Sequence, residues 1–428
     1  MRLSALIVDF GLLRQNAHFR AVFVARLMSV FALGLLTVAV PVQIHELTGS
    51  SLQVGFALAL DGVGMFLGLL CGGVLADRHD RRSLILGARG LCGIGFLALA
   101  LNSFVASPSL LALYLVSFWD GFFGAMGITA LMAAIPGLVG RDNLPAAGAL
   151  SMLITRFGAV LAPLAGSLII AAAGVRWNYL LAGVGTLATL LALTRLPRLV
   201  PQGEAAGEHP LRALLQGLLF LRGNAVVGAV IALGTVQALL SAVRVLFPAL
   251  SEQVYGRGEI GVGLMFAAVP AGALVGAFTS GWVGGLRRPG AVLLACVCAA
   301  ALLVASLGLS TQLAPALAAL ALLGYLGAIA SLLQFTLVQG HTPDHLLGRV
   351  NSLWSAQDVV GDSAGALGLG ALARALLPAS AVGVFGLAAA ALAALLGPRL
   401  GVLRRLDGNA QPLHEDDDQD SAQQGAAP

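Results

Sequence analysis

Long apolar stretches separated by short polar loops recur along the whole chain. Twelve of them come close to or exceed the roughly 20 residues that a helix needs to cross a bilayer. They cover residues 19–46, 51–76, 83–104, 109–136, 145–172, 177–196, 224–250, 259–284, 289–309, 313–339, 347–374 and 379–400. This pattern predicts an all-α polytopic membrane protein with twelve transmembrane helices.

Composition and the absence of known motifs argue against a soluble protein, a nucleotide-binding protein and a metalloprotein. Of the 428 residues, 58% are hydrophobic and 10% are charged, which is typical of a membrane protein and not of a soluble one. The sequence contains no Walker-type nucleotide-binding motif, no H-E-x-x-H zinc motif and no second cysteine pair that would complete a metal site. We therefore expect no cofactor, no metal, no catalytic residue and no nucleic-acid partner, with the lipid bilayer as the surroundings.

Arginines concentrate in every second loop between the apolar stretches. Loops of one set contain Arg78, Arg81, Arg82, Arg195, Arg198, Arg212, Arg222, Arg287 and Arg288. The other set has only Arg176, Arg257 and Arg374. Because cytoplasmic loops of membrane proteins carry an excess of basic residues, the arginine-rich loops and both chain termini are predicted to be cytoplasmic.

The two halves of the chain are related. An offset of about 208 residues places Asn224 on Asn16 and Gly276 on Gly68. A polar stretch with three prolines lies between the halves, at 195–217. We predict an N-terminal six-helix bundle (1–196), a central cytoplasmic linker (197–223), a C-terminal six-helix bundle (224–403) and a disordered acidic cytoplasmic tail (404–428).

Two local motifs resemble those of the major facilitator superfamily. The loop after the second stretch reads Gly73-x-Leu-Ala-Asp77-Arg78-x-x-Arg81-Arg82, with Asp80 in place of the usual glycine. The fifth stretch contains Gly158, Pro163 and Gly166 in a pattern similar to that of proton-coupled exporters, with Ala162 and Ser167 in place of glycines. The resemblance implies that both motifs act in gating. Asp77 would reach the start of the eleventh span, near 348–352, and hold the bundles shut on the cytoplasmic side.

A closer resemblance extends over residues 15–400. The segments "FRAVFVARLMSVFALGLLTVAVPVQI", "FWDGFF", "AVRVLFPAL" and "LLGRVNSLWSAQDVVGD" look like those of bacterial exporters of catecholate siderophores such as enterobactin. This implies an inner-membrane protein that moves a siderophore from cytoplasm to periplasm in exchange for protons, with possible handover to an outer-membrane efflux system. A multidrug or lipophile proton antiporter is the alternative, and an intramembrane enzyme is a remote one.

Charged residues inside the predicted spans are the candidates for proton coupling. Each costs about 2.5 to 3.5 kcal/mol near the bilayer centre, so each needs a partner, a watery cavity or a task. They are Asp61, Asp120, Arg156, Asp358 and Asp362. Two carboxylates four residues apart on one helix, Asp358 and Asp362, should not both ionise, so one is expected to hold a proton. The alternative is neutralisation by an arginine of a neighbouring helix, such as Arg156 for Asp120.

A second set of residues suits an anionic, oxygen-rich cargo. Guanidinium groups remain charged and donate hydrogen bonds in a fork, and aromatic rings stack on them. The candidates are Arg26, Trp119, Gln237, Arg244, Gln334, Phe335 and Gln357. The resemblance implies that Arg26 and Arg244 lie on cavity-lining spans. Alternatively, the aromatic residues are packing residues, and Arg26 bonds a backbone carbonyl or extends to the membrane interface.

Overall fold

The computed structural model describes residues 13–14, 16–140, 143–194, 196–199 and 210–399, and within these ranges the chain forms helices and no strand. The first half contains α2 (Ala17–Thr48), α3 (Ser51–Arg78), α4 (Arg81–Phe104), α5 (Leu110–Val139), α6 (Leu144–Ala173) and α7 (Val175–Leu193). The predicted acidic tail (404–428), Arg195 and residues 200–209 of the predicted linker lie outside the described residues.

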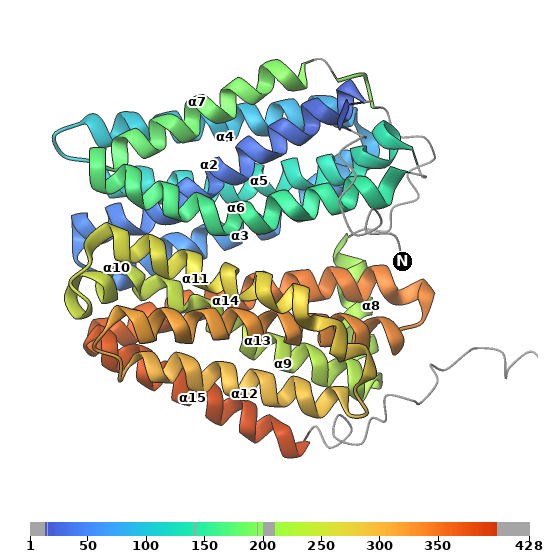
Figure 1. The fold of residues 1–428 in the computed structure, drawn as a ribbon. Helices are drawn as coiled ribbons and strands as arrows, with labels where there is room; N and C mark the ends of the chain where they lie inside the picture. Colours follow the sequence, from blue (N-terminus) through green and yellow to red (C-terminus); the bar gives the residue numbers. More distant parts are fainter. Residues whose placement is uncertain (1–12, 15, 141–142, 195, 200–209, 400–428) are drawn as a thin grey trace, which may run out of the picture.

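The second half repeats this arrangement, with an irregular first span. It contains α9 (Ala225–Ser241), η3 (Ala242–Leu246), α10 (Phe247–Ala249), η4 (Leu250–Val254), α11 (Gly258–Thr279), η5 (Ser280–Gly285), α12 (Pro289–Leu307), α13 (Leu313–Gly340), α14 (Asp344–Ala375) and α15 (Pro378–Arg399). A further helix, α8 (Pro210–Gly223), lies within the predicted linker. Figure 1 shows the halves as two adjacent bundles, which confirms the predicted all-α fold of two six-helix bundles.

Within the described ranges, ten helical segments are long and apolar enough to cross a membrane. The other two predicted spans are α7 and α14, which carry more polar residues. Arg176 and Asn178 lie in the first turn of α7, and Asp358 and Asp362 lie in the middle of α14. The carboxylates on α14 therefore need compensation from neighbouring helices.

The two bundles begin with the same local structure, as the sequence offset predicts. Asn16 caps α2 by accepting a hydrogen bond from the Phe19 N–H (2.9 Å) and donates to the Leu138 carbonyl (2.9 Å). Asn224 caps α9 in the same way through Val227 (3.0 Å) and donates to the His341 carbonyl (3.0 Å). Each asparagine thus ties the start of its bundle's first span to the end of the fourth.

The two bundles contact each other closely at the end of the molecule opposite the arginine-rich loops, here called the far end. A Cβ added at Gly55 on α3 would lie 2.3 Å from the Ala366 carbonyl oxygen on α14. A Cβ at Gly263 on α11 would lie 2.0 Å from Ser167 Oγ on α6. His45 Nε2 of one bundle lies 3.3 Å from Glu252 Oε2 of the other and joins the bundles there. Small residues therefore let the helices of opposite bundles meet at the far end.

The arginine-rich loop between α3 and α4 lies at the other end, here called the basic end. Asp80 caps α4 by accepting from the Arg82 N–H (3.2 Å) and also accepts from the Leu199 N–H (2.8 Å). Burial acts to raise the pKa of Asp80, but the backbone donors of Leu199 and Arg82 and the Ser83 hydroxyl outweigh it and lower this pKa. Asp80 thus replaces the usual glycine by capping the next helix.

The paired arginines of this loop bond within the first bundle. Arg81 Nη1 donates to the Ala133 carbonyl (2.8 Å) on α5, and Arg82 Nη2 donates to the Thr194 carbonyl (2.6 Å) after α7. Asp77 and Arg78 are exposed and, among the described residues, make no ion pair. In this conformation the loop therefore fastens α4 to α5 and α7. The predicted contact of Asp77 with the start of α14 stays a prediction for another state.

Candidate functional site

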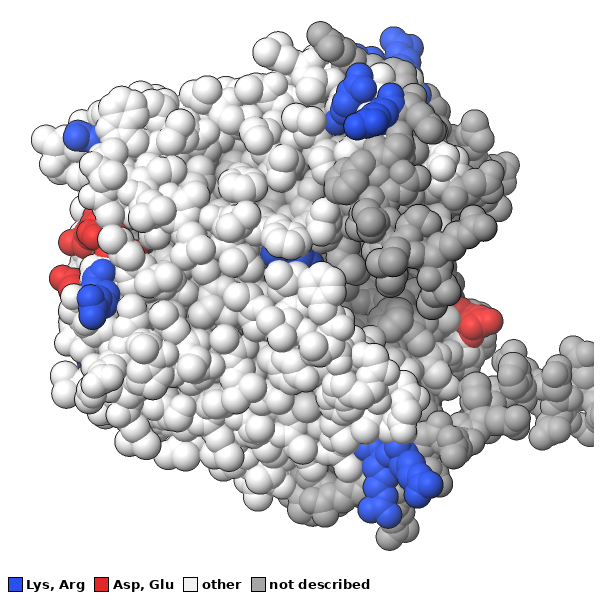
Figure 2. Space-filling view, in the orientation of Figure 1, with Lys and Arg blue, Asp and Glu red and all other residues white. Residues whose placement is uncertain are grey.

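A chamber of about 540 Å³ lies between the bundles and is here called the first chamber. Helices of both halves line it, chiefly α2, α6, α9 and α11. Its polar lining consists of Arg26, Ser29, Thr37, Arg89, Thr155, Gln237, Ser241 and Arg244. The rest of the lining is mostly apolar, with Leu33, Phe247 and Phe266 among its members, and contains no carboxylate among the described residues. Figure 2 shows a hollow between the two halves with basic atoms visible in it.

Arg26 and Arg89 enter the first chamber from α2 and α4. Arg26 Nη2 donates to Thr155 Oγ1 (3.3 Å) on α6, and Arg26 Nε is buried without a hydrogen-bond partner among the described residues. Arg89 has 8% of its surface exposed and lies within electrostatic reach of Arg26, Cys92 and Asp120. Arg89 lies within the apolar stretch 83–104 of the sequence, and its place in the site depends on the fold.

A second chamber of about 350 Å³ adjoins the first. Asp61, Asp120 and Arg244 are its charged lining residues, and it shares Leu33, Thr37, Ile128 and Arg244 with the first chamber. Close packing of α3 on α5 brings the two aspartates there, because a Cβ at Gly121 would lie 2.1 Å from the Asp61 carbonyl oxygen. Asp120 Oδ1 is buried and accepts no hydrogen bond from the described residues.

Arg244 connects the two chambers. Its Nη2 donates to Asp362 Oδ2 on α14 at 2.5 Å, and the Ser241 hydroxyl donates to Asp362 Oδ1. The side chains of Arg244 and Asp362 are 29% and 21% exposed, so this ion pair is largely removed from solvent. Asp362 therefore has an arginine and a serine as partners, and the predicted sharing of a proton between Asp358 and Asp362 stays a prediction.

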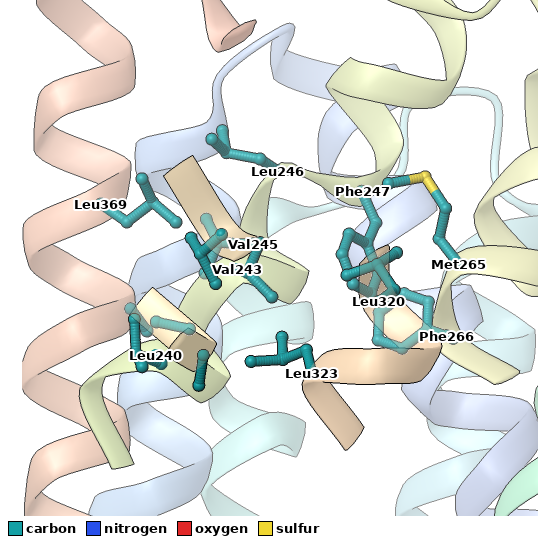
Figure 3. Close-up of a cluster of buried hydrophobic side chains, with 14 of the residues drawn as sticks. Leu240, Val243, Val245, Leu246, Phe247, Met265, Phe266, Leu320, Leu323 and Leu369 are labelled. Atoms are coloured by element: carbon teal, nitrogen blue, oxygen red, sulfur yellow. The ribbon is translucent and has the colours of Figure 1, made fainter. Parts of the chain in front are cut away.

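Pro248 determines how Arg244 is presented. Proline has no N–H to give to the Arg244 carbonyl four residues earlier, and the chain tightens so that the Phe247 N–H donates to that carbonyl instead. The side chains around this irregular turn are buried against α11, α13 and α14, as Figure 3 shows for Val243, Val245, Leu246, Phe247, Met265, Phe266, Leu320, Leu323 and Leu369. These closely packed apolar side chains thus hold Arg244 in place at the wall of the first chamber.

Three glutamines meet where α9, α13 and α14 pack together. Gln334 Nε2 donates to Gln237 Oε1 (2.7 Å), and Gln237 Nε2 donates to Ser331 Oγ (3.2 Å). The amide atoms of Gln357 are buried without a partner among the described residues. Only Gln237 of the three lines the first chamber, so Gln334 and Gln357 support the wall behind it.

Several predicted site residues lie outside the two chambers. Trp119 Nε1 donates to the Leu91 carbonyl (2.8 Å) and its ring packs against Phe123, so Trp119 joins α5 to α4. Phe335 is 52% exposed and packs near Trp354 at 6.5 Å between ring centroids. Arg156 and Asp358 are exposed and belong to neither chamber lining. The basic neighbour of Asp120 is Arg89 and not Arg156.

The small residues of the α6 motif are packing positions between helices. A Cβ at Gly158 would lie 2.3 Å from Val30 Cγ1, and one at Gly166 would lie 3.4 Å from Leu35 Cα, both on α2. Pro163 lies between these glycines and lines the first chamber. One face of α6 thus fits closely on α2 while Ser167 contacts α11 of the other bundle, so the motif lies where the bundles meet.

Two six-helix bundles with charged chambers at their interface define a membrane transporter. The chain belongs to the Major Facilitator Superfamily, whose family model matches residues 22–369. It is 47% identical over 405 residues to the enterobactin exporter EntS of Citrobacter koseri, covering 95% of this chain and 97% of that protein. It is 46% identical, with the same coverage, to the enterobactin exporter EntS of Escherichia coli O1:K1. These relatives are transporters, so the chain is a transporter and not an enzyme.

Solved structures show the same fold at low sequence identity. The nucleoside transporter NupG is 12% identical with a TM-score of 0.74, covering 91% of this chain and 99% of that one. A bacterial homologue of the human lysosomal transporter Spinster, in an inward-facing and unoccupied conformation, is 15% identical with a TM-score of 0.70 and covers 91% and 97%. These similarities support the fold of a multi-pass membrane protein.

Proposed function

We propose that this protein exports a catecholate siderophore of the enterobactin type from the cytoplasm to the periplasm across the bacterial inner membrane, with both termini in the cytoplasm. The observation that carries the proposal is the first chamber, which joins three arginines to an apolar lining free of carboxylates among the described residues. Sequence identity of 46–47% to enterobactin exporters over 95% of the chain supports the same cargo.

The chamber suits an aromatic cargo whose oxygens are ionised. Guanidinium groups bind adjacent oxygens through a fork of donors, and the apolar wall with Phe247 and Phe266 offers contact to ring faces. A chamber of about 540 Å³ is within the roughly 300–1,000 Å³ range of small-molecule sites. The same charges disfavour the cationic lipophiles that many drug antiporters move, so the multidrug alternative is the weaker one.

We propose that protons drive export through the acids of the second chamber. Asp61 and Asp120 lie beside the first chamber. The Oδ1 atom of Asp120, which has no hydrogen-bond partner among the described residues, carries a desolvation cost that a bound proton would remove. Protons taken from the periplasm would then accompany the return of the empty transporter. Asp362 joins this group through Arg244, whereas Asp358 and Arg156 stay outside both chambers.

Alternating access would follow from the arrangement of the two bundles. Close helix contacts and the His45–Glu252 contact lie at the far end, and the exposed Asp77 lies at the basic end. Opening the far end would separate these contacts while Asp77 closes the basic end against α14. Cargo released there would pass to an outer-membrane efflux system.

Deletion of the gene in an iron-starved siderophore producer tests this function. Cells without the gene should accumulate siderophore and release less of it, and the wild-type gene should restore release. The Arg244→Leu variant should fail to restore release, whereas Arg257→Gln, at the exposed far end and outside both chambers, should restore it. Unchanged release after deletion would contradict the siderophore assignment.

A further inference from the structure

Arg89 is a buried cation whose N–H donors have no acceptor among the described residues. Only 8% of its surface is exposed, and it lines the first chamber from α4. Among the described residues it makes no hydrogen bond. Its interactions with Asp120, Cys92 and Arg26 are electrostatic interactions without a bonded contact. A guanidinium has five N–H donors, and within the described part of the chain those of Arg89 are left for a ligand in the first chamber.

Arg26 also has N–H donors that the described part of the protein leaves unused. Its one hydrogen bond among the described residues is a long contact of 3.3 Å to Thr155, and its Nε is buried without a partner. Arg26 and Arg89 lie close enough to repel each other, and Asp120 in the second chamber is the only carboxylate that acts on Arg89 within the described part of the chain. Arg89 thus has one acid within electrostatic range and Arg26 shows none among the described residues, so the pair carries a net positive charge into an apolar space.

Arg244 differs from this pair because its charge is already balanced. Asp362 accepts from it at 2.5 Å, and Ser241 holds the other oxygen of that carboxylate. Because Asp362 already neutralises Arg244, an anion that enters the first chamber gains less charge compensation at Arg244 than at an arginine without a bonded carboxylate. The same anion at Arg26 and Arg89 would meet unused donors and two positive charges that Asp120 alone does not neutralise.

We propose that Arg89, together with Arg26, forms an oxyanion subsite of the first chamber that binds the adjacent ionised oxygens of an aromatic ligand. Arg89 is then a residue that selects anionic over neutral cargo. This inference rests on the proposed function for the identity of the whole cargo but not for the subsite itself. The bound oxygens fit the two guanidinium groups, while Leu131 and Leu33 cover the ring.

The experiment uses the purified full-length protein in lipid nanodiscs and two small probes. One probe is 2,3-dihydroxybenzoate, an aromatic anion with adjacent oxygens, and the other is the neutral methyl ester of its dimethyl ether. Wild-type protein should bind the anion more tightly than the neutral probe. Arg89→Gln should raise the Kd of the anion at least about tenfold, the loss expected for one charge-assisted contact, and leave the neutral probe unchanged.

Matched variants separate binding from structure. Arg89→Lys keeps the charge without the fork and should fall between wild type and Arg89→Gln, and Arg257→Gln should bind like wild type. If Arg89 merely neutralised Asp120, Arg89→Gln would weaken both probes equally or neither, and the subsite would be overturned. Equal binding of the two probes by wild type would overturn it as well.

The same measurements distinguish this inference from the proposed function. Arg89-dependent binding of the anion, combined with normal siderophore release after gene deletion, would leave the subsite standing and remove the siderophore assignment. Loss of siderophore release after deletion, combined with an anion Kd that Arg89→Gln leaves unchanged, would support the exporter function and refute the subsite.

Discussion

The two chambers share Arg244 but differ in the charge that they present. The first chamber has arginines and no lining carboxylate among the described residues, whereas the second has Asp61 and Asp120. The first lies chiefly between α2, α6, α9 and α11, and the second lies between α2, α3 and α5, so the difference comes from which helices contribute the few charged side chains to otherwise apolar surroundings. Under the proposed function, separation of basic and acidic groups would let one protein hold an anionic cargo and a proton in neighbouring places without direct competition for one group.

The largest expected effect is the loss of transport when the acids of the second chamber are replaced. Replacement of Asp61 and Asp120 together by asparagine should abolish siderophore transport driven by a pH gradient in proteoliposomes, because no carboxylate would remain in that lining to carry a proton. Binding of the anionic cargo should persist, since the first chamber keeps its arginines. Gradient-driven transport at the wild-type rate in this double variant would place the proton site elsewhere. Asp358→Asn, on an exposed side chain, is the matched control and should retain transport.

A smaller effect is expected where the chambers meet. Asp362→Ala leaves Arg244 without its counter-ion and should cost about 2 kcal/mol of stability, below the roughly 3–5 kcal/mol of fully buried pairs because both side chains keep some exposure. Thermal unfolding in detergent would measure the loss as a lower Tm. The double variant Asp362→Ala with Arg244→Leu should recover much of it, because neither charge remains. A double variant no more stable than the single one would show that the pair contributes little.

The hydrogen bond from Ser241 gives a finer test of the same junction. Ser241→Ala removes one donor from the Asp362 carboxylate and should lower stability by about 1 kcal/mol. The Arg244 ion pair should survive, so anion binding should change little. Ser306→Ala, which removes a hydroxyl bonded only to its own helix at Leu303, should have a smaller effect on Tm.

The smallest effect on either chamber is expected from the loop at the basic end. Asp77 is exposed and unpaired in this conformation, so Asp77→Asn should change stability by less than about 0.5 kcal/mol and leave cargo affinity unchanged. Turnover in proteoliposomes should nevertheless fall if Asp77 closes the basic end in the other state. A large loss of affinity with normal turnover would contradict a gating role.

The sequence alone determined the class of protein, the spans and the repeat. Apolar length identifies a membrane helix because lipid leaves the backbone no other partner, and this requirement is read directly from composition. The helix caps were equally local, since Asn16 and Asn224 each bond a residue three positions ahead. The motif loop was also recognisable, although the role of Asp80 as a cap on α4 depended on the fold.

Only the tertiary structure decided which charges meet. Asp358 and Asp362 are neighbours on α14, yet Asp362 bonds Arg244, which lies 118 positions away in the sequence. Trp119 and Phe335 are residue types that suit a cargo site, but they pack outside the two chambers. Arg89, by contrast, lines the first chamber from α4. Helices that are apolar on every side carry little signal of which face will meet a neighbour. Packing of small residues between helices sets those faces, and it becomes visible only when both helices are in place.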